Sequence, residues 1–497
     1  FPGEEDFGMV PVEALASGDE PHLIGQSEFD GLKGRVSQVN GLCMAAHGTM
    51  MNFALMRTCL EVMSEAFLGD AAFNPEGDVL DGIPEEFVGP MLADLVAHEV
   101  GHTLGLRHNF KGSSVYTMDE INSENVAGKK PFATTVMDYI PVNINAKGWG
   151  ERQGDWAMTG IGPYDYWAIE YGYTFGDTAE VLKRVAEPEL QYATDEDTWG
   201  PDPLARRYDF SRDPLDYAQN QLALAAKIRE KILDKFVKDG DSWSRARRGY
   251  MISLAQHVQA VGMMANWVGG AHVYRDKKGD PNGRAPIEPV PAETQRKALQ
   301  FVIDNTFNEE AFGLTPDLLR HMSVDKWWDD NSALEDAAFP IHDRVLAVQA
   351  SALTMLLNPA TLGRVYDNER FIGEDGETLT LPELMSTLTD AAWAELDRDP
   401  AKRKHTDRDP MISSFRRNLQ REHVDRMVAL STSGTGFVAA AKPVSNLATM
   451  TLVDLQGKIE KTLEKGEDRL DSYTRAHLHD CLRRIGSALD AQTTFRG

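Results

Sequence analysis

We expect an α+β fold class for this 497-residue chain, with an N-terminal lobe around one histidine-bearing helix and a mostly α-helical remainder. Apolar residues recur at helical spacing over residues 47–67 and along most of the chain after residue 217. Residues 1–90 hold no clean alternating apolar run of strand length, so the sheet of this lobe is either supplied from elsewhere or poorly visible in the sequence. The β part of the class comes from a family resemblance carried by the histidine-bearing helix.

The first 175 residues are expected to contain three helices joined by turns and loops. After a Gly- and acid-rich stretch without a period, a helix is predicted over 47–67. A second helix is expected to have Pro90 in its first turn and to run to about Leu104. An irregular loop over 111–135 then precedes a third helix over 164–173.

The composition excludes some classes of partner. Of the residues, 42% are hydrophobic and 26% charged, an ordinary globular mixture, and the net charge is −26. Nucleic acid is not expected as a partner, because phosphate binding needs basic stripes. No apolar run reaches 18 residues, so no membrane span is predicted.

The most informative segment is HEVGHTLGLRH, from His98 to His108. His98 and His102 are four residues apart, so on a helix both rings can reach one metal ion. Gly105 can take a positive φ, which lets the chain turn and present His108 as a third ligand. Three protein ligands leave one tetrahedral position open, as in catalytic zinc sites. Glu99 lies beside these ligands and is predicted to be the general base of a hydrolytic reaction.

The pattern HExxHxxGxxH resembles that of the metzincin zinc endopeptidases. Segments 162–169 and 194–203 extend the likeness to large bacterial zinc-dependent metalloproteases with uncharacterised flanking domains. The resemblance implies an α+β catalytic lobe, one catalytic Zn²⁺, hydrolysis of peptide bonds in a peptide or protein substrate, and a periplasmic or secreted bacterial location. Asn109, directly after the third histidine, departs from the residues common at that position.

Metzincins also carry a methionine in a tight turn beneath the zinc, and Met137 is the candidate for this Met-turn. Its thioether would pack the floor of the site; otherwise Met137 is an ordinary core residue. Tyr139 resembles a tyrosine that astacin-like and serralysin-like members use as an extra zinc ligand and oxyanion donor, and the alternative is a packed wall residue. Asp138 is expected to orient the turn, and Ile140 and Pro141 to form a specificity wall.

The domains are predicted to be an N-terminal lead-in segment (1–30), a metzincin-like catalytic domain (31–175), an acidic linker (176–216) and a helical C-terminal domain (217–497). The acidic residues of 190–216 favour a solvated linker, with a Ca²⁺ site as the alternative because hard cations bind clustered oxygens. Further helices are expected to begin near Ala292, Ile341, Leu381, Met411, Leu452 and Asp471.

Cys43, Cys59 and Cys481 lack the spacing of a zinc knuckle and are expected to be buried, reduced thiols. The chain begins at Phe1 and shows no signal peptide, so its own N-terminal segment is a candidate partner that completes the sheet or inhibits the site. The expected function is a zinc endopeptidase. A non-catalytic zinc-binding module and a zinc hydrolase of a non-peptide acyl bond are the alternatives, and Glu99 argues against the first.

Overall fold

The computed structural model describes residues 43–63, 78–80, 83–146, 152–158, 160–326, 336–373, 376–432 and 439–491. The predicted lead-in segment 1–30 lies outside them. Up to residue 213 the helices and strands are α2 (Ala45–Met63), β1 (Val79–Leu80), β2 (Ile83–Pro84), α3 (Glu85–Thr103), η4 (Gly112–Ser114), α4 (Met118–Ile121), α5 (Pro163–Tyr173), α6 (Ala179–Leu182), η5 (Pro188–Leu190) and η6 (Asp195–Trp199).

The rest of the chain is mostly long helices. Its elements are α7 (Pro214–Lys231), η7 (Ile232–Phe236), α8 (Ser244–Ala265), β3 (Ala271–Val273), β4 (Ile287–Pro289), α9 (Ala292–Thr306), η8 (Glu309–Phe312), α10 (Pro316–His321), α11 (Ile341–Leu357), α12 (Pro359–Phe371), α13 (Leu381–Ala392), η10 (Ala394–Asp397), η11 (Pro400–Lys402), α14 (Ser414–Thr432), α15 (Ala441–Gly466), η12 (Glu467–Arg469) and α16 (Ser472–Leu489).

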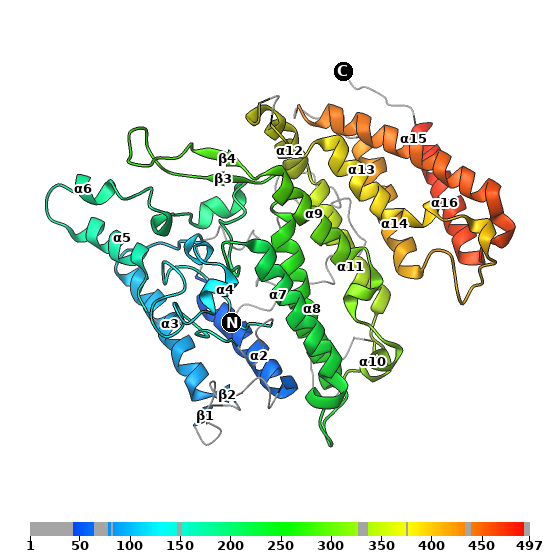
Figure 1. Cartoon of the computed structure of the whole chain (residues 1–497). Coiled ribbons are helices and arrows are strands. Elements are labelled where there is room, and N and C mark those ends of the chain that lie inside the picture. The colour runs from blue at the N-terminus through cyan, green and yellow to red at the C-terminus, as the bar shows by residue number, and fades with distance from the viewer. Residues whose placement is uncertain are drawn as a thin grey trace.

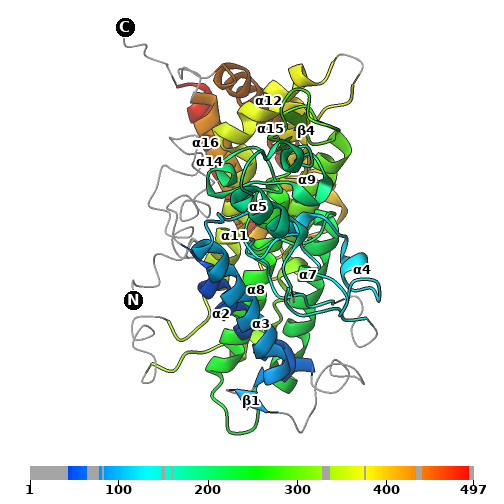
Figure 2. The same cartoon turned by 90° about the vertical axis from the view of Figure 1, so that its left-hand side faces the viewer.

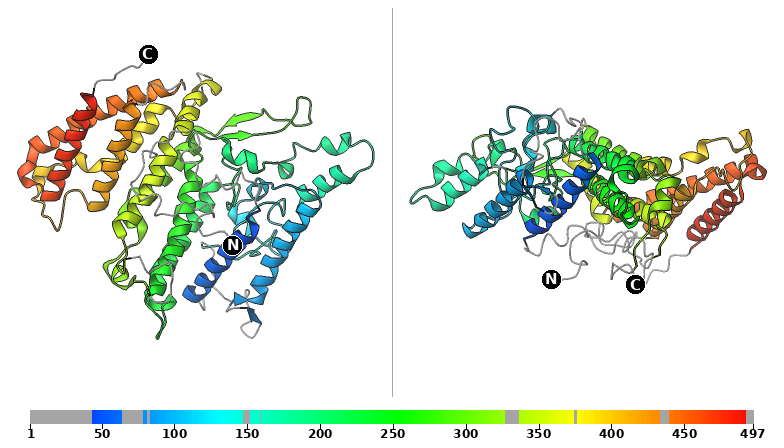
Figure 3. Two further views of the ribbon diagram at one scale, coloured as in Figure 1. Left: turned by 180° about the vertical axis from the view of Figure 1, so that it is seen from behind. Right: turned by 90° about the horizontal axis from the view of Figure 1, so that it is seen from below.

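The helices follow one another across the molecule, from α3 and α2 at one end to α14, α15 and α16 at the other (Figure 1). The antiparallel pair α7 and α8 stands between them, and α11 joins α8 to α14. Figure 2 looks along this row from the α3 end, and Figure 3 shows the same order from behind and from below. The histidine-bearing helix α3 therefore lies at one end of the row, and its outer side faces away from the later helices.

The fold class is confirmed, since helices dominate and the strands are few and short. Both described strand pairs are antiparallel: β1 pairs with β2 and β3 with β4. The only strands among the described residues ahead of α3 are β1 and β2, each of two residues. The sheet that the family resemblance implies before the zinc helix is not found among these residues.

The histidine-bearing helix begins earlier than predicted. It starts at Glu85, so Pro90 lies inside it rather than in its first turn. Pro90 removes one intrahelical hydrogen bond. The negative charges of Glu85 and Glu86 in the first turn stabilise the helix, because they face the positive end of the helix dipole. Gly105, just beyond the helix, has φ of +87°, which confirms the positive φ expected there.

The other early helices agree with expectation. The helix predicted over 47–67 corresponds to α2 as far as Met63, and residues 64–67 lie outside the described residues. Helix α2 packs beside α3, with the rings of Phe53 and Phe87 5.9 Å apart. The helix predicted over 164–173 is α5, and the loop over 111–135 is irregular except for η4 and α4.

Two apolar cores connect the predicted catalytic and helical domains. One runs from Met118 and Met137 to Ile485, and the other from Leu55 and Phe87 to Val348. Because each core contains residues from both sides of the 176–216 segment, the chain around α3 is folded onto the later helices. The domain boundaries themselves stay predictions.

Among the later helices, α9, α11 and α13 begin where the sequence predicted. Asp471 caps α16, whose first helical residue is Ser472. Helix α15 begins at Ala441, well before the predicted Leu452. Helix α12 was not predicted; Asn358 caps it by accepting from the N–H of Thr361.

One described stretch, Ile341–Phe371, is long and apolar enough to cross a membrane by length and composition. It consists of α11 and α12, and 67% of its apolar window is buried inside the molecule. The core helix of a soluble protein gives the same signal, and α11 packs against α8, α9 and α14. The expectation of no membrane span stays a prediction.

Candidate metal centre

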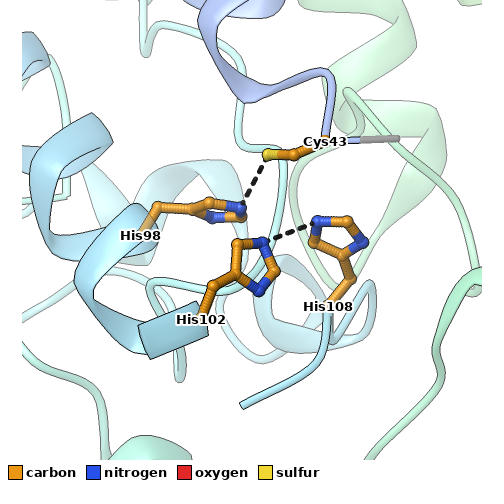
Figure 4. A group of neighbouring side chains, drawn as sticks. All are labelled: Cys43, His98, His102 and His108. Atoms are coloured by element: carbon orange, nitrogen blue, oxygen red, sulfur yellow. Dashed lines mark hydrogen bonds between the residues drawn. The ribbon is translucent and has the colours of Figure 1, made fainter. Parts of the chain in front are cut away.

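The three predicted zinc ligands come together at the C-terminal end of α3. His98 and His102 project from the helix and His108 from the turn that follows it, with the rings facing one another (Figure 4). The Nε2 atoms of His102 and His108 are 3.2 Å apart. Together with Cys43, the three histidines offer ligand atoms that all lie within 4.8 Å of one another, and no other such metal-binding group was found among the described residues.

Two of the histidines are oriented by backbone carbonyl oxygens. The Nδ1 atom of His98 lies 2.7 Å from the oxygen of Val136, and that of His102 lies 3.0 Å from the oxygen of Leu106. A carbonyl oxygen only accepts hydrogen bonds, so Nδ1 carries the proton in each ring. The lone pair is then on Nε2, the atom that faces the centre of the group.

The third histidine is oriented by a carboxylate. Nδ1 of His108 donates to Asp195 Oδ2 at 2.9 Å, and Arg207 Nη2 donates to Asp195 Oδ1 at 2.7 Å. Burial alone would raise the pKa of Asp195, but these bonds hold it below its ordinary value. Asp195 therefore stays ionised and fixes Nε2 of His108 as the ligand atom. No local sequence pattern indicates this role, because Asp195 lies 87 residues after His108 in the acidic stretch.

The donor set fits a zinc ion. Two nitrogens about 2.0–2.1 Å from a tetrahedral zinc lie about 3.3 Å from each other, close to the observed separation of His102 and His108. Burial lowers the pKa of His98 to about 4, so its ring is neutral over the physiological range. Neutral imidazole nitrogens are zinc's common protein ligands.

Met137 lies directly beneath the zinc helix and is fully buried. A Cβ on Gly101 would overlap its sulfur atom, so the helix can approach the methionine only because residue 101 is glycine. The carbonyl of Met137 also accepts from the N–H of Asn109, and this hydrogen bond joins the turn to the segment directly after His108. This is the position expected of the Met-turn residue.

The turn around Met137 is held by Asp165 of α5. Asp165 Oδ2 accepts from the N–H of Val136 at 2.9 Å, and Oδ1 accepts from the hydroxyl of Thr135 at 2.5 Å. Asp138, which was expected to orient the turn, bonds on both sides of it: its carboxylate accepts from the N–H of Ser113 in the loop after the zinc motif and from the N–H of Tyr139 in the turn itself.

Asn109, the residue that departs from the common metzincin pattern, has a fully buried side chain. Its Oδ1 accepts from the N–H of Ala193 at 3.1 Å, and its Nδ2 donates to the carbonyl of Gln191 at 3.0 Å. These bonds anchor the segment that leads to Asp195. Asn109 therefore helps to place the carboxylate that orients His108.

Much of the 190–216 stretch is packed against this loop rather than solvated. Asp195, Asp202 and Asp209 are all buried. Asp202 Oδ2 pairs with the buried Lys111 at 2.6 Å. The prediction of a solvated linker is wrong for these three residues. His108 and Arg207 compensate the burial of Asp195, and Lys111 compensates that of Asp202, whereas Asp209 accepts from the hydroxyl of Ser113. The cations found next to Asp195 and Asp202 are Arg207 and Lys111, and the alternative of a Ca²⁺ site stays untested.

The other predicted site residues lie around the three histidines. The hydroxyl of Tyr139 lies 3.0 Å from His108 Nε2, and burial raises the pKa of this phenol. Glu99 is on the exposed side of α3. Ile140 lines a small cavity beside His98, between α2, α3 and the Met-turn, whereas Pro141 is buried.

Cys43 was expected to be a buried thiol, and this was wrong. Cys59 and Cys481 are buried, but Cys43 is exposed and points at the histidines from the residues before α2 (Figure 4). Its Sγ lies 3.5 Å from His98 Nε2 and donates to Glu99 Oε1 at 3.4 Å. No sequence motif links a cysteine to histidines 55 residues away, so only the fold could reveal it.

A family model described as Met-zincin matches residues 81–400, more than half of the chain. Neither the curated proteins nor the solved structures gave a match. The matched range includes the three histidines, Met137 and Asp195 and continues through α13. The chain therefore belongs to the Met-zincin family of zinc-dependent metallopeptidases.

Proposed function

We propose that this protein is an endopeptidase in which His98, His102 and His108 hold one zinc ion and Glu99 acts as general base. The observation that carries the proposal is the convergence of three Nε2 atoms. In each ring the proton on Nδ1 is held by a hydrogen bond, so the lone pair on Nε2 is available to a metal ion. Glu99 follows the first of these ligands on the same helix. A purely structural zinc site would have no use for that carboxylate.

The chain's own residues divide the chemistry among them. When bound, zinc supplies Lewis acidity to the scissile carbonyl and to the attacking water. Glu99 accepts the proton of that water and then delivers it to the leaving amine. Tyr139, whose hydroxyl faces the same point as His108 Nε2, donates a hydrogen bond to the oxyanion as it develops.

The surrounding residues act by positioning. Asp195, with Arg207 behind it, holds the ring of His108 in its ligand orientation. Met137 fills the space under α3 and so fixes the height of the helix above the turn. Ile140 is proposed to form part of the wall against which a substrate side chain packs.

The expected location stays part of this proposal: a periplasmic or secreted bacterial protein acting on peptides or proteins. Hydrolysis of a non-peptide acyl bond would use the same groups, and a peptide panel distinguishes the two. The non-catalytic alternative has one observation in its favour, the thiol of Cys43 beside the histidines.

The test is Glu99→Gln, which keeps the size of the side chain and removes its basicity. We expect cleavage of a broad quenched-fluorescent peptide panel to fall by about 10²–10⁴-fold. Zinc content should remain unchanged, because Glu99 is not a ligand. Equal cleavage by parent and variant would refute the general-base role, and cleavage of acyl esters but not peptides by the parent would refute the peptidase assignment.

A further inference from the structure

We propose that Cys43 is a fourth ligand of the metal centre and that Cys43 and Met44 form a displaceable cover, which keeps the site closed until it is moved. The inference rests on the proposed peptidase function for its inhibitory part. Its coordination part stands on geometry alone.

The position of the sulfur fits coordination. A zinc ion at about 2.3 Å from a sulfur and 2.0–2.1 Å from a nitrogen separates the two atoms by about 3.6 Å at a tetrahedral angle. The observed distance from Cys43 Sγ to His98 Nε2 is 3.5 Å. Figure 4 shows the thiol on the side of the histidine group that the three rings leave open.

Two tyrosines hold the cover in place. The N–H of Met44 donates to the hydroxyl of Tyr139 at 2.6 Å, and the hydroxyl of Tyr208 donates to the carbonyl of Met44 at 3.1 Å. Tyr208 has a φ of 59°, unusual for a residue with a side chain, and its ring lies against the first turn of α2. A Cβ on Gly48 would overlap that ring, so the close approach depends on glycine.

The cover occupies every group that the proposed reaction needs. Cys43 takes the open metal position and bonds to the carboxylate of Glu99. Met44 uses the hydroxyl of Tyr139, which would otherwise serve the oxyanion. On coordination the S–H bond is replaced by a sulfur–metal bond, and Glu99 Oε1 accepts the proton. Movement of the cover returns that proton to sulfur and frees all three groups together.

The location of the cover makes it displaceable. Cys43 precedes α2 and is exposed, whereas His98 and His108 are buried. A structural zinc site is closed by four protein ligands. Here three ligands are fixed by hydrogen bonds at Nδ1, and the fourth is carried by a short segment that two tyrosine hydroxyls hold.

The first measurement is spectroscopic and needs no substrate. The 497-residue chain is loaded with Co²⁺, because a thiolate bound to this ion gives a sulfur-to-metal absorption in the near ultraviolet. We expect this absorption in the parent and in Cys481→Ala, a control at a buried cysteine far from the site. It should vanish in Cys43→Ser, while the visible bands of histidine-bound Co²⁺ remain. Its absence from the parent would overturn the proposal.

The second measurement uses the zinc-loaded chains and fluorescein-labelled casein. If the closed state holds at least nine tenths of the parent molecules, Cys43→Ser should cleave about tenfold faster or more. Tyr208→Phe removes only the hydroxyl that holds Met44, so it should give a smaller increase with the sulfur absorption retained. Adding Glu99→Gln to Cys43→Ser should abolish the gain.

The outcomes separate the two claims. If Cys43→Ser loses both the sulfur absorption and its zinc, the site is a closed structural one and the displaceable cover is wrong. If zinc is retained but parent and Cys43→Ser cleave casein equally well, the sulfur is a ligand without an inhibitory role, and the cover is overturned. If the absorption behaves as expected and no variant cleaves, the peptidase function fails while the fourth ligand stands.

Discussion

The loops around the zinc motif and the helices from α7 to α16 both bury histidines, but the rings differ in which nitrogens are already bonded. Burial lowers the pKa of both His98 and His423 to about 4. His423 has partners on both nitrogens, Trp393 on Nδ1 and Thr389 on Nε2. His98 bonds to the protein backbone only through Nδ1 and turns Nε2 to the other ligands. Burial and pKa therefore do not distinguish a ligand from a core histidine; the bonding of the second nitrogen does.

The same contrast extends to how each region is held together. The helices bury leucine, isoleucine and valine along continuous stripes. The loops around His108 instead bury polar groups, among them Asn109, Lys111, Asp165 and Asp195, each with specific partners. Deleting one member of a polar network leaves its partner buried and unsatisfied, whereas deleting an apolar side chain leaves a cavity. Substitutions in the two regions should therefore fail in different ways.

The largest effect after loss of Glu99 is expected for Asp195→Asn. The amide keeps the shape of the side chain but weakens the hold on His108 Nδ1 and removes the negative charge beside Arg207. Zinc affinity should fall by about 10–100-fold. Competition with a chromogenic chelator measures this directly.

The matched control is Glu395→Gln in the helical region, where the buried Arg416 loses the same kind of partner. It should lower the free energy of unfolding and leave zinc affinity unchanged. Equal zinc affinity for Asp195→Asn and the parent would remove Asp195 from the centre.

The contrast also explains how much could be predicted. The family, the helical character and the three histidines follow from local spacing, since residues four apart on a helix meet wherever the helix lies. Asp195 and Cys43 depend on contacts 87 and 55 residues away, which no local pattern encodes. The acidic stretch looked solvated because charge predicts exposure, and the compensating Lys111 and Arg207 are visible only in the fold. The start of α3 was misplaced because Pro90, usually a first-turn signal, is tolerated inside this helix.

A smaller effect is expected from packing under the zinc helix. Gly101→Ala places a methyl group against the sulfur of Met137, which should cost about 1–3 kcal/mol of stability through overpacking. Gly89→Ala, on the same helix with open space around its Cβ, should instead stabilise by about 0.4–1 kcal/mol. Urea unfolding of both variants gives the comparison. Two variants of similar stability would mean that Met137 does not support α3.

The smallest effect appears only in acid and belongs to the helical region. The folded pKa of His423, about 4, lies below its ordinary value of 6.5, because burial and then the charge of Arg426 disfavour the imidazolium. Between these pH values the unfolded chain binds more protons, so this stabilising contribution is present above pH 6.5 and is lost as the pH falls toward 4. His423→Gln should therefore reduce the dependence of unfolding free energy on pH in that window by up to about 1.4 kcal/mol per pH unit. Because the parent and the variant share the metal centre, the difference between their slopes isolates the contribution of His423. An unchanged slope in His423→Gln would show that acid acts elsewhere in the chain.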